Sequence, residues 1–160
     1  MNNKVHFSSL KMDFKTPNAF YNELDKEFHF DFDPCPTNPK FDGLKISWGK
    51  RNFINPPYGR KIKDWIKKAY EEYLNNKLCV LLIPSRTDTK WWHDYIMKSN
   101  DIRFIKGRLK FSDYKNSAPF PSCVVVFSNG LEDTRDNKIK SVLNNTYEVW
   151  KRFSDIEDLK

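Results

Sequence analysis

The sequence lacks a long apolar run and contains only three cysteines, and each shortage argues against a class of protein. No apolar stretch approaches the roughly 20 residues that a membrane span needs. The N-terminus, Met1 to His6, has no apolar core of a signal peptide. Cys35, Cys79 and Cys123 match no zinc-ligand spacing, and their odd number argues against a disulfide framework. We therefore expect a cytoplasmic protein with no membrane partner.

Internal repeats and low-complexity linkers are also absent, which predicts a single domain over residues 1–160. We expect its core over about 12–128 and a C-terminal helix over about 136–152. Hydrophobic residues make up 39% of the chain and aromatic residues 16%, which is enough to bury a core and is not typical of disorder. The formal charge of +7 suits a polyanionic partner such as nucleic acid.

Hydrophobic periodicity predicts alternating helices and strands. The clearest pattern covers Lys61–Asn76, where apolar residues recur at the three- and four-residue spacing of an amphipathic helix. Cys79–Ile83 is a continuous apolar run, as expected of a strand that is covered on both faces. The other predicted elements are a helix that starts at Thr16 and runs through Phe28, a helix over Thr89–Met97, and strands at Phe30–Asp33, Arg51–Ile54, Ile102–Ile105 and Cys123–Phe127.

This order predicts the α/β class, with a mainly parallel sheet and helices on both faces. The last two strands have no helix between them, so we expect them to form an antiparallel pair at one edge. In such a sheet, ligands bind outside the carboxyl ends of the strands. Three polar segments follow predicted strands at that end: Asp33-Pro34, Asn55–Tyr58 and Pro84–Arg86. The sequence therefore predicts a functional site there.

The segment Asn55-Pro56-Pro57-Tyr58 is the strongest candidate for catalysis. Its two prolines fix the backbone and remove two N–H donors, which leaves carbonyl oxygens to accept hydrogen bonds. Those oxygens and the Asn55 amide could accept from the amino group of a purine, and the Tyr58 ring could stack on the base. Such hydrogen bonds favour a more reactive amino nitrogen, and positioning then carries methyl transfer without a strong base. The alternative is a rigid turn with no chemistry.

Several motifs, taken in order, resemble the phage-type DNA N-6-adenine-methyltransferase (Dam) family. The matching residues are Thr16-Pro17, Asp33-Pro34-Cys35, Asp42-Gly43-Leu44 with Trp48, Phe53 to Gly59, Pro84 to Thr87, Trp91 to His93, Gly107 to Phe111 and Ala118 to Ser122. The resemblance implies a Rossmann-like methyltransferase fold, S-adenosyl-L-methionine as cofactor, and DNA as the partner, methylated on the exocyclic N6 of adenine.

The resemblance also implies where the cofactor binds. Thr16-Pro17 resembles the segment at the methionine end of the cofactor, and Asp33-Pro34 resembles the motif at the end of the first strand. Asp42 resembles the acidic residue that accepts from the cofactor's adenine. The usual glycine-rich turn is missing, since Pro36 to Pro39 stands there instead, so we expect a cofactor loop of another shape.

For the DNA, the resemblance makes basic residues candidates for phosphate contacts. These candidates are Arg60, Lys61, Arg86, Arg108 and Lys110. Phe111 is a candidate second aromatic wall for a flipped base, with Phe120 nearby in sequence. A solvated face and core packing are the respective alternatives. At the level of function, methylation of RNA adenine or of a protein amide, and a non-catalytic nucleic-acid-binding relative, stay open.

Overall fold

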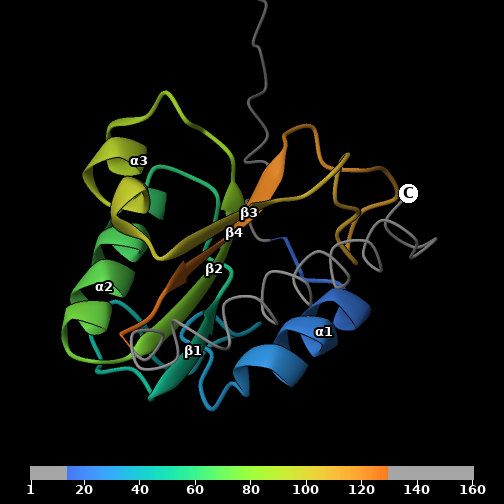
Figure 1. The fold of residues 1–160 in the computed structure, drawn as a ribbon. Helices are drawn as coiled ribbons and strands as arrows, with labels where there is room; N and C mark the ends of the chain where they lie inside the picture. Colours follow the sequence, from blue (N-terminus) through green and yellow to red (C-terminus); the bar gives the residue numbers. More distant parts are fainter. Residues whose placement is uncertain (1–13, 130–160) are drawn as a thin grey trace, which may run out of the picture.

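The computed structural model describes residues 14–129 of the chain, and these residues form an α/β structure around a four-stranded mixed sheet (Figure 1). The predicted C-terminal helix over about 136–152 lies outside the described residues. The elements in chain order are α1 (Asn18–Phe28), β1 (Arg51–Ile54), α2 (Ile62–Leu74), β2 (Leu78–Pro84), α3 (Lys90–Asp94), the 3₁₀ helix η1 (Ile96–Lys98), β3 (Asp101–Phe104) and β4 (Ser122–Phe127).

The sheet order is β1-β2-β4-β3, and it corrects the predicted topology. β1 and β2 are parallel, but β4 runs antiparallel to both β2 and β3, so the sheet is not mainly parallel. β3 and β4 do form the expected antiparallel pair. However, β4 lies inside the sheet and only β3 lies at its edge. The burial of the two strands explains this arrangement, since every residue of β4 is buried while β3 exposes Phe104 and carries Asp101 and Arg103.

The predicted strand Phe30–Asp33 is reduced to one isolated bridge, in which Phe32 pairs with Asn52 of β1 in parallel. Three backbone hydrogen bonds hold the segment against β1. The Arg51 carbonyl accepts from the N–H groups of Asp31 at 2.8 Å and Phe32 at 3.2 Å, and the Phe32 carbonyl accepts from the Phe53 N–H at 3.1 Å. Pairing stops at Pro34, which has no N–H to donate. The segment still runs parallel to β1 and β2, so all three end on the same side of the molecule.

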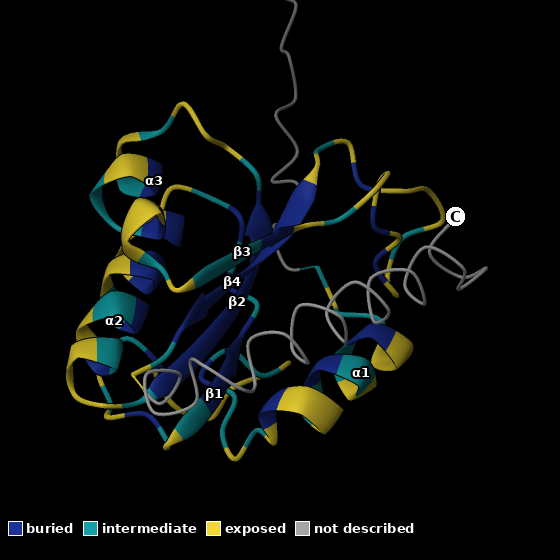
Figure 2. Cartoon of the chain, in the orientation of Figure 1, coloured by how far each residue is buried: buried dark blue, intermediate teal, exposed yellow. Residues whose placement is uncertain are grey.

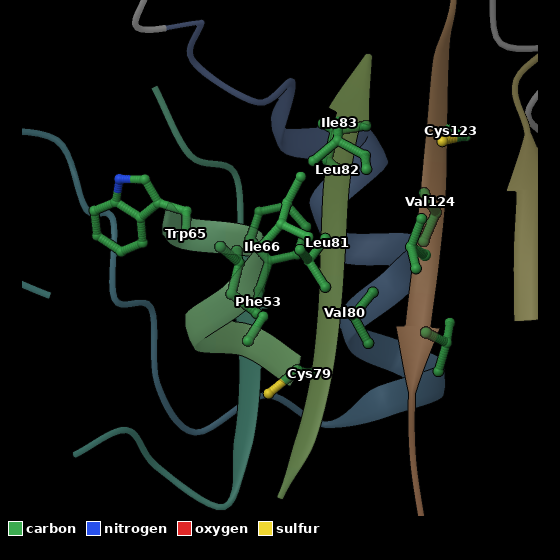
Figure 3. Close-up of a cluster of buried hydrophobic side chains, with 14 of the residues drawn as sticks. Phe53, Trp65, Ile66, Cys79, Val80, Leu81, Leu82, Ile83, Cys123 and Val124 are labelled. Atoms are coloured by element: carbon green, nitrogen blue, oxygen red, sulfur yellow. The ribbon is translucent and has the colours of Figure 1, made fainter. Parts of the chain in front are cut away.

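Helices cover both faces of the sheet, as predicted, with α1 on one side and α2 and α3 on the other (Figure 1). On the α1 side, the Tyr21 ring meets the Phe53 ring edge to face at 5.1 Å. On the α2 side, Tyr73 packs against Phe127 of β4 with ring centroids 5.6 Å apart. The strands between them are buried along most of their length (Figure 2). Figure 3 shows part of this core, with side chains from β1, α2, β2 and β4.

An ion pair between the buried Arg103 and the more exposed Glu27 links α1 to the edge strand. The Arg103 guanidinium donates two hydrogen bonds to the Glu27 carboxylate, at 2.6 and 2.7 Å, and a third to Asp101 at 2.6 Å. Burial alone lowers the pKa of Arg103, but the two carboxylates outweigh it and raise that pKa. Within residues 14–129, no helix is both long and apolar enough to cross a membrane.

Candidate active site

A cleft of about 750 Å³ opens beyond the carboxyl ends of the 30–33 segment and β1. This volume lies in the range of small-molecule sites, and the position is the one expected for ligands of α/β sheets. The cleft is lined by Phe14, Lys15, Thr16, Asn18, Tyr21, Asp33, Pro34, Cys35, Pro36, Thr37, Asn38, Pro39, Phe41, Asp42, Gly43, Phe53, Asn55, Pro57, Lys61, Trp65 and Asp113.

The cleft brings together residues that the sequence analysis took from separate motifs. The predicted site residues that line it are Thr16, Asp33, Pro34, Asp42, Asn55, Pro57 and Lys61. The predicted site residues that do not line it are Pro17, Pro56, Tyr58, Arg60, Arg86, Arg108, Lys110 and Phe111.

Asn55 follows β1 directly, and only the nitrogen of its side-chain amide forms hydrogen bonds among the described residues. Its Nδ2 donates to the Phe14 carbonyl at 2.5 Å and to Thr16 Oγ1 at 2.8 Å. The Phe14 carbonyl can only accept, which fixes the orientation of the amide. Within the described residues, the buried Oδ1 atom has no hydrogen-bond partner. Leaving a buried acceptor unpaired is unfavourable by about 1–3 kcal/mol, so the site is prepared for a ligand that donates an N–H or O–H.

Asp33 lines the same cleft and is partly desolvated. Burial raises the pKa of its carboxyl group, and the hydrogen bond that Oδ1 accepts from the Cys35 N–H at 2.8 Å offsets part of that rise. Among the described residues, Asp33 forms no ion pair. A cationic group placed in the cleft beside it would stabilise the charged carboxylate.

Close packing holds Asp42 at the rim of the cleft. A Cβ atom on the neighbouring Gly43 would lie 2.2 Å from the Pro34 carbonyl oxygen and 2.7 Å from the Trp65 ring, so only glycine fits there. Trp48 Nε1 donates to the Gly43 carbonyl at 2.7 Å, and this hydrogen bond fixes the position of the loop. The Asp42 carboxylate accepts from the Leu44 N–H at 3.1 Å, and this hydrogen bond lowers the pKa of Asp42. Its carboxylate is exposed and available to a ligand in the cleft.

The loop at residues 36–39, which stands in place of a glycine-rich turn, has a left-handed backbone conformation at an asparagine and not at a glycine. Asn38 has a φ angle of 54°, in the region that glycine usually occupies. Asparagine tolerates this conformation better than most other residues because its short polar side chain can hydrogen-bond locally. The prolines at 36 and 39 restrict the backbone on either side. The loop therefore turns tightly without glycine, and it lines the cleft throughout.

Tyr58 and Phe111 lie next to the cleft in a cluster of aromatic rings. The Tyr58 hydroxyl donates to the Leu82 carbonyl at 2.9 Å, and burial raises its pKa well above the ordinary value. Phe111 is also buried and meets the Tyr58 ring at 6.1 Å. The ring of Phe14 stacks on Tyr58 at 5.2 Å and contacts Phe111 at 5.0 Å. Phe14 lines the cleft as well, so it connects the cleft to the cluster.

The basic candidates for DNA contact are exposed: Arg60, Lys61, Arg86, Arg108 and Lys110. Arg60 and Lys61 lie just before α2, and Lys61 lines the cleft. Strand β3 ends at Phe104, so Arg108 and Lys110 lie in the loop before β4 and not on a strand. Contact of these side chains with DNA stays a prediction.

Sequence reasoning missed several residues of the cleft. Phe14 and Lys15 precede the Thr16-Pro17 motif and belong to no periodic pattern, while Asp113 lies far along the chain. Trp65 could have been found only as a core residue, since it follows the apolar stripe of α2. Within residues 14–129, no group of histidine, cysteine and acidic side chains is arranged to hold a metal ion.

Comparison with known families agrees with the motifs in the cleft. The family model described as DNA N-6-adenine-methyltransferase (Dam) matches residues 6–152, which include the whole cleft and the aromatic cluster. No curated protein sequence matches the chain.

Proposed function

Because the chain belongs to the DNA N-6-adenine-methyltransferase (Dam) family, we propose that it transfers a methyl group from S-adenosyl-L-methionine to the exocyclic N6 of adenine in DNA. The observation that carries the proposal is the Asn55 amide, whose Oδ1 is buried and unpartnered at the carboxyl end of β1. An amino group is the donor that such an oxygen needs. The motif that presents it is Asn55-Pro56-Pro57-Tyr58.

The cleft fits the proposed cofactor in size and in its polar groups. S-adenosyl-L-methionine supplies an electrophilic methyl group on a sulfonium centre. Its ammonium group would give the partly desolvated Asp33 carboxylate the cationic partner that it lacks among the described residues. We assign the methionine end to Asp33, Pro34 and Thr16-Pro17, and the adenine end to Asp42. A cleft of about 750 Å³ is large enough for such a ligand. Two parallel segments, residues 30–33 and β1, end at this cleft, and β2 runs parallel to β1, which supports a Rossmann-like fold.

Asn55 would act on the nitrogen that is methylated. Its Oδ1 would accept one hydrogen of the adenine amino group, and the Pro56 carbonyl would accept the other, because the Pro57 carbonyl already accepts from the Gly59 N–H at 3.0 Å. Both hydrogen bonds draw the nitrogen lone pair out of conjugation with the ring. Thr16 and the Phe14 carbonyl hold the Asn55 amide in place through Nδ2. Preorganised acceptors of this kind accelerate a reaction without a strong base.

The exposed basic residues would bind the phosphates of the DNA. Lys61 lines the cleft, and Arg60 is its neighbour in the sequence. Both can therefore bind the DNA backbone beside the entering base. Arg108 and Lys110 extend positive charge along the loop before β4. Phosphate contacts position nucleic acid but carry no sequence information directly, so base readout depends on few other side chains.

The proposal is tested by transfer of a labelled methyl group from the cofactor to DNA, RNA or protein. We expect label on N6 of adenine in DNA, and Asn55→Ala should reduce turnover by on the order of 10²–10³. Asn22→Ala is the matched control, because Asn22 is exposed on α1 and lies outside the cleft. Cofactor affinity, measured by calorimetry, should be similar in both variants. Label on RNA or protein alone, or near-normal turnover of Asn55→Ala, would exclude the proposed reaction.

A further inference from the structure

Phe14 contacts two tyrosine rings. Its ring is 5.2 Å from the Tyr58 ring at an interplanar angle of 30°, and 4.7 Å from the Tyr114 ring at 25°. Nearly parallel rings at these centroid distances overlap face to face, since rings lying side by side would be further apart. Both tyrosines therefore stack on the Phe14 ring.

Two further rings close the space around Phe14. Phe120 meets it edge on, at 5.3 Å and 87°, and Phe111 is tilted against it at 5.0 Å and 49°. The resulting slot, defined here by Tyr58, Phe111, Tyr114 and Phe120, surrounds the Phe14 ring. It adjoins the cleft, because Phe14 lines both. Stacked aromatic walls around a planar group are the arrangement that binds nucleic-acid bases.

The slot also adjoins the unpartnered acceptor of the catalytic motif. Asn55 Nδ2 bonds to the backbone carbonyl of Phe14, so the Asn55 amide is tied to the residue whose ring fills the slot. A planar base in place of that ring would present its edge to the same amide. Tyr58 ends the motif that Asn55 begins, so a single short segment supplies both a wall and an acceptor.

We infer that this slot is the binding site for the target adenine, and that the Phe14 ring occupies it until the base displaces it. The inference rests on the proposed function and assigns two residues to it that the motifs do not contain. Tyr114 stacks on the adenine, as Tyr58 does. Phe14 is a resident competitor whose ring takes the place of the base.

The position of Phe14 allows this displacement. Phe14 is only partly buried, whereas the core rings Phe20 and Phe111 are 0% and 1% exposed. It lies before α1, outside any helix or strand. The backbone there is held by the bonds from Asn55 Nδ2 to the Phe14 carbonyl and from the Ser112 N–H to the Lys15 carbonyl. Both hydrogen bonds use backbone carbonyls of this segment, so neither of them holds the Phe14 side chain itself.

A resident ring lowers the apparent affinity for the base by the fraction of molecules in which the slot is open. If Phe14 fills the slot in about nine molecules of ten, removing it should tighten base binding roughly tenfold. Removing a stacking wall acts in the opposite direction. Replacement of an aromatic side chain that stacks on a base typically weakens binding by about five- to a hundredfold.

The experiment compares a single-stranded oligodeoxyadenylate with the same strand carrying abasic sites in place of its bases, without cofactor. The dissociation constant of the abasic strand divided by that of the oligodeoxyadenylate measures the contribution of the bases, and a higher ratio means tighter base binding. We expect Phe14→Ala to raise that ratio about tenfold and Tyr114→Ala to lower it about fivefold or more. Tyr114→Phe keeps the ring and is the matched control, with a ratio close to that of the unmodified protein.

Phe14→Leu is a second variant that keeps apolar volume against Phe111 and Phe120 and loses only the planar ring. Its thermal unfolding should resemble that of the unmodified protein, and its ratio should change in the same direction as that of Phe14→Ala. An unchanged or lower ratio in the folded Phe14 variants would overturn the inference, because Phe14 would then be a wall or a core residue. An unchanged ratio in Tyr114→Ala would overturn it as well.

These measurements separate the slot from the reaction. If the base-dependent ratios change as expected but no methyl group is transferred to DNA, the slot stands and the proposed function fails. If DNA is methylated but the ratios do not respond to Phe14 or Tyr114, the function stands and the slot is elsewhere.

Discussion

Replacement of Asp33 by asparagine should make the free protein more stable and the cofactor complex weaker. The two side chains have the same shape, and the asparagine carbonyl can still accept the hydrogen bond from the Cys35 N–H. The substitution therefore removes only the charge. Burial has raised the pKa of this carboxyl group, so its charged form is less favourable in the folded chain than in the unfolded one.

The pH dependence of this effect follows from the direction of the pKa shift. Below the unfolded-state pKa of about 4, Asp33 is protonated in both states and asparagine gives no advantage. As the pH rises through the higher pKa of the folded state, the carboxyl ionises and the folded protein loses stability that the Asp33→Asn variant would retain. At neutral pH we expect Asp33→Asn to gain on the order of 1 kcal/mol, or about 2–4 °C in Tm for a domain of this size.

Cofactor binding should respond in the opposite sense, because the ammonium group of S-adenosyl-L-methionine loses its ionic partner. Loss of a hydrogen bond to a charged group is unfavourable by about 1.5–3 kcal/mol, which weakens binding by roughly 10- to 150-fold. Thermal unfolding between about pH 3 and pH 8, the range in which the Asp33 carboxyl group ionises, measures the change in stability. Calorimetry with the cofactor measures the change in affinity. Asp31→Asn is the control, since Asp31 lies on the same segment but outside the cleft.

The reasoning is refuted by either of two results. If Asp33→Asn does not stabilise the free protein at neutral pH relative to Asp31→Asn, the carboxylate is not penalised by burial. If it stabilises the protein but leaves cofactor affinity unchanged, the ammonium group is bound elsewhere in the cleft.

Two further predictions concern the fold and the DNA. Glu27→Ala should reduce the free energy of unfolding, measured in urea, by about 1.5–3 kcal/mol, because the buried Arg103 loses its charged hydrogen bonds to Glu27 and keeps only Asp101. Glu71→Ala, which breaks an exposed pair, should change it by less than about 0.5 kcal/mol. A smaller loss in Glu27→Ala would mean that the ion pair does not fasten α1. Replacing Arg108 and Lys110 together by alanine should make the slope of log binding constant against log salt concentration less steep by about 1–2. An unchanged slope would mean that other residues contact the DNA phosphates.

The sequence predicted most helices and strands but not the order of the strands, because periodicity reports burial and not neighbours. Ser122–Phe127 is apolar throughout, which a strand inside the sheet requires, and its burial is complete. The pattern of Asp101–Phe104 is mixed, as suits an edge. These signals were present in the sequence, yet the helix–strand alternation that precedes them favoured a parallel arrangement. The pairing of β4 with β2 depends on contacts between residues far apart in sequence, such as Cys79 with Phe127.

The cofactor side of the cleft was predictable because its residues follow directly after strands. Asp33 and Asn55 each come at the end of a parallel segment, and the carboxyl ends of parallel segments meet on one side of a sheet. The loop that lacks glycine was recognised as unusual, but its conformation could not be predicted. It depends on the left-handed backbone of Asn38 and on the close contact of Gly43 with Pro34 and Trp65, both of which are set by packing.

The base side of the site was predictable only where it coincided with a motif. Tyr58 was proposed as a stacking wall because it follows Asn55, and Phe111 because a second wall was expected. In the structure both Tyr58 and Tyr114 stack on Phe14, while Phe111 is tilted against it and Phe120 meets it edge on. Phe14 and Tyr114 lie far apart in sequence, and no period relates them. What joins them is the hydrogen bond between Ser112 and Lys15, which draws the loop before β4 onto the segment before α1. The two segments must therefore fold together before a base site exists. Ser112→Pro, which removes the N–H donor of this bond, should weaken base binding more than cofactor binding.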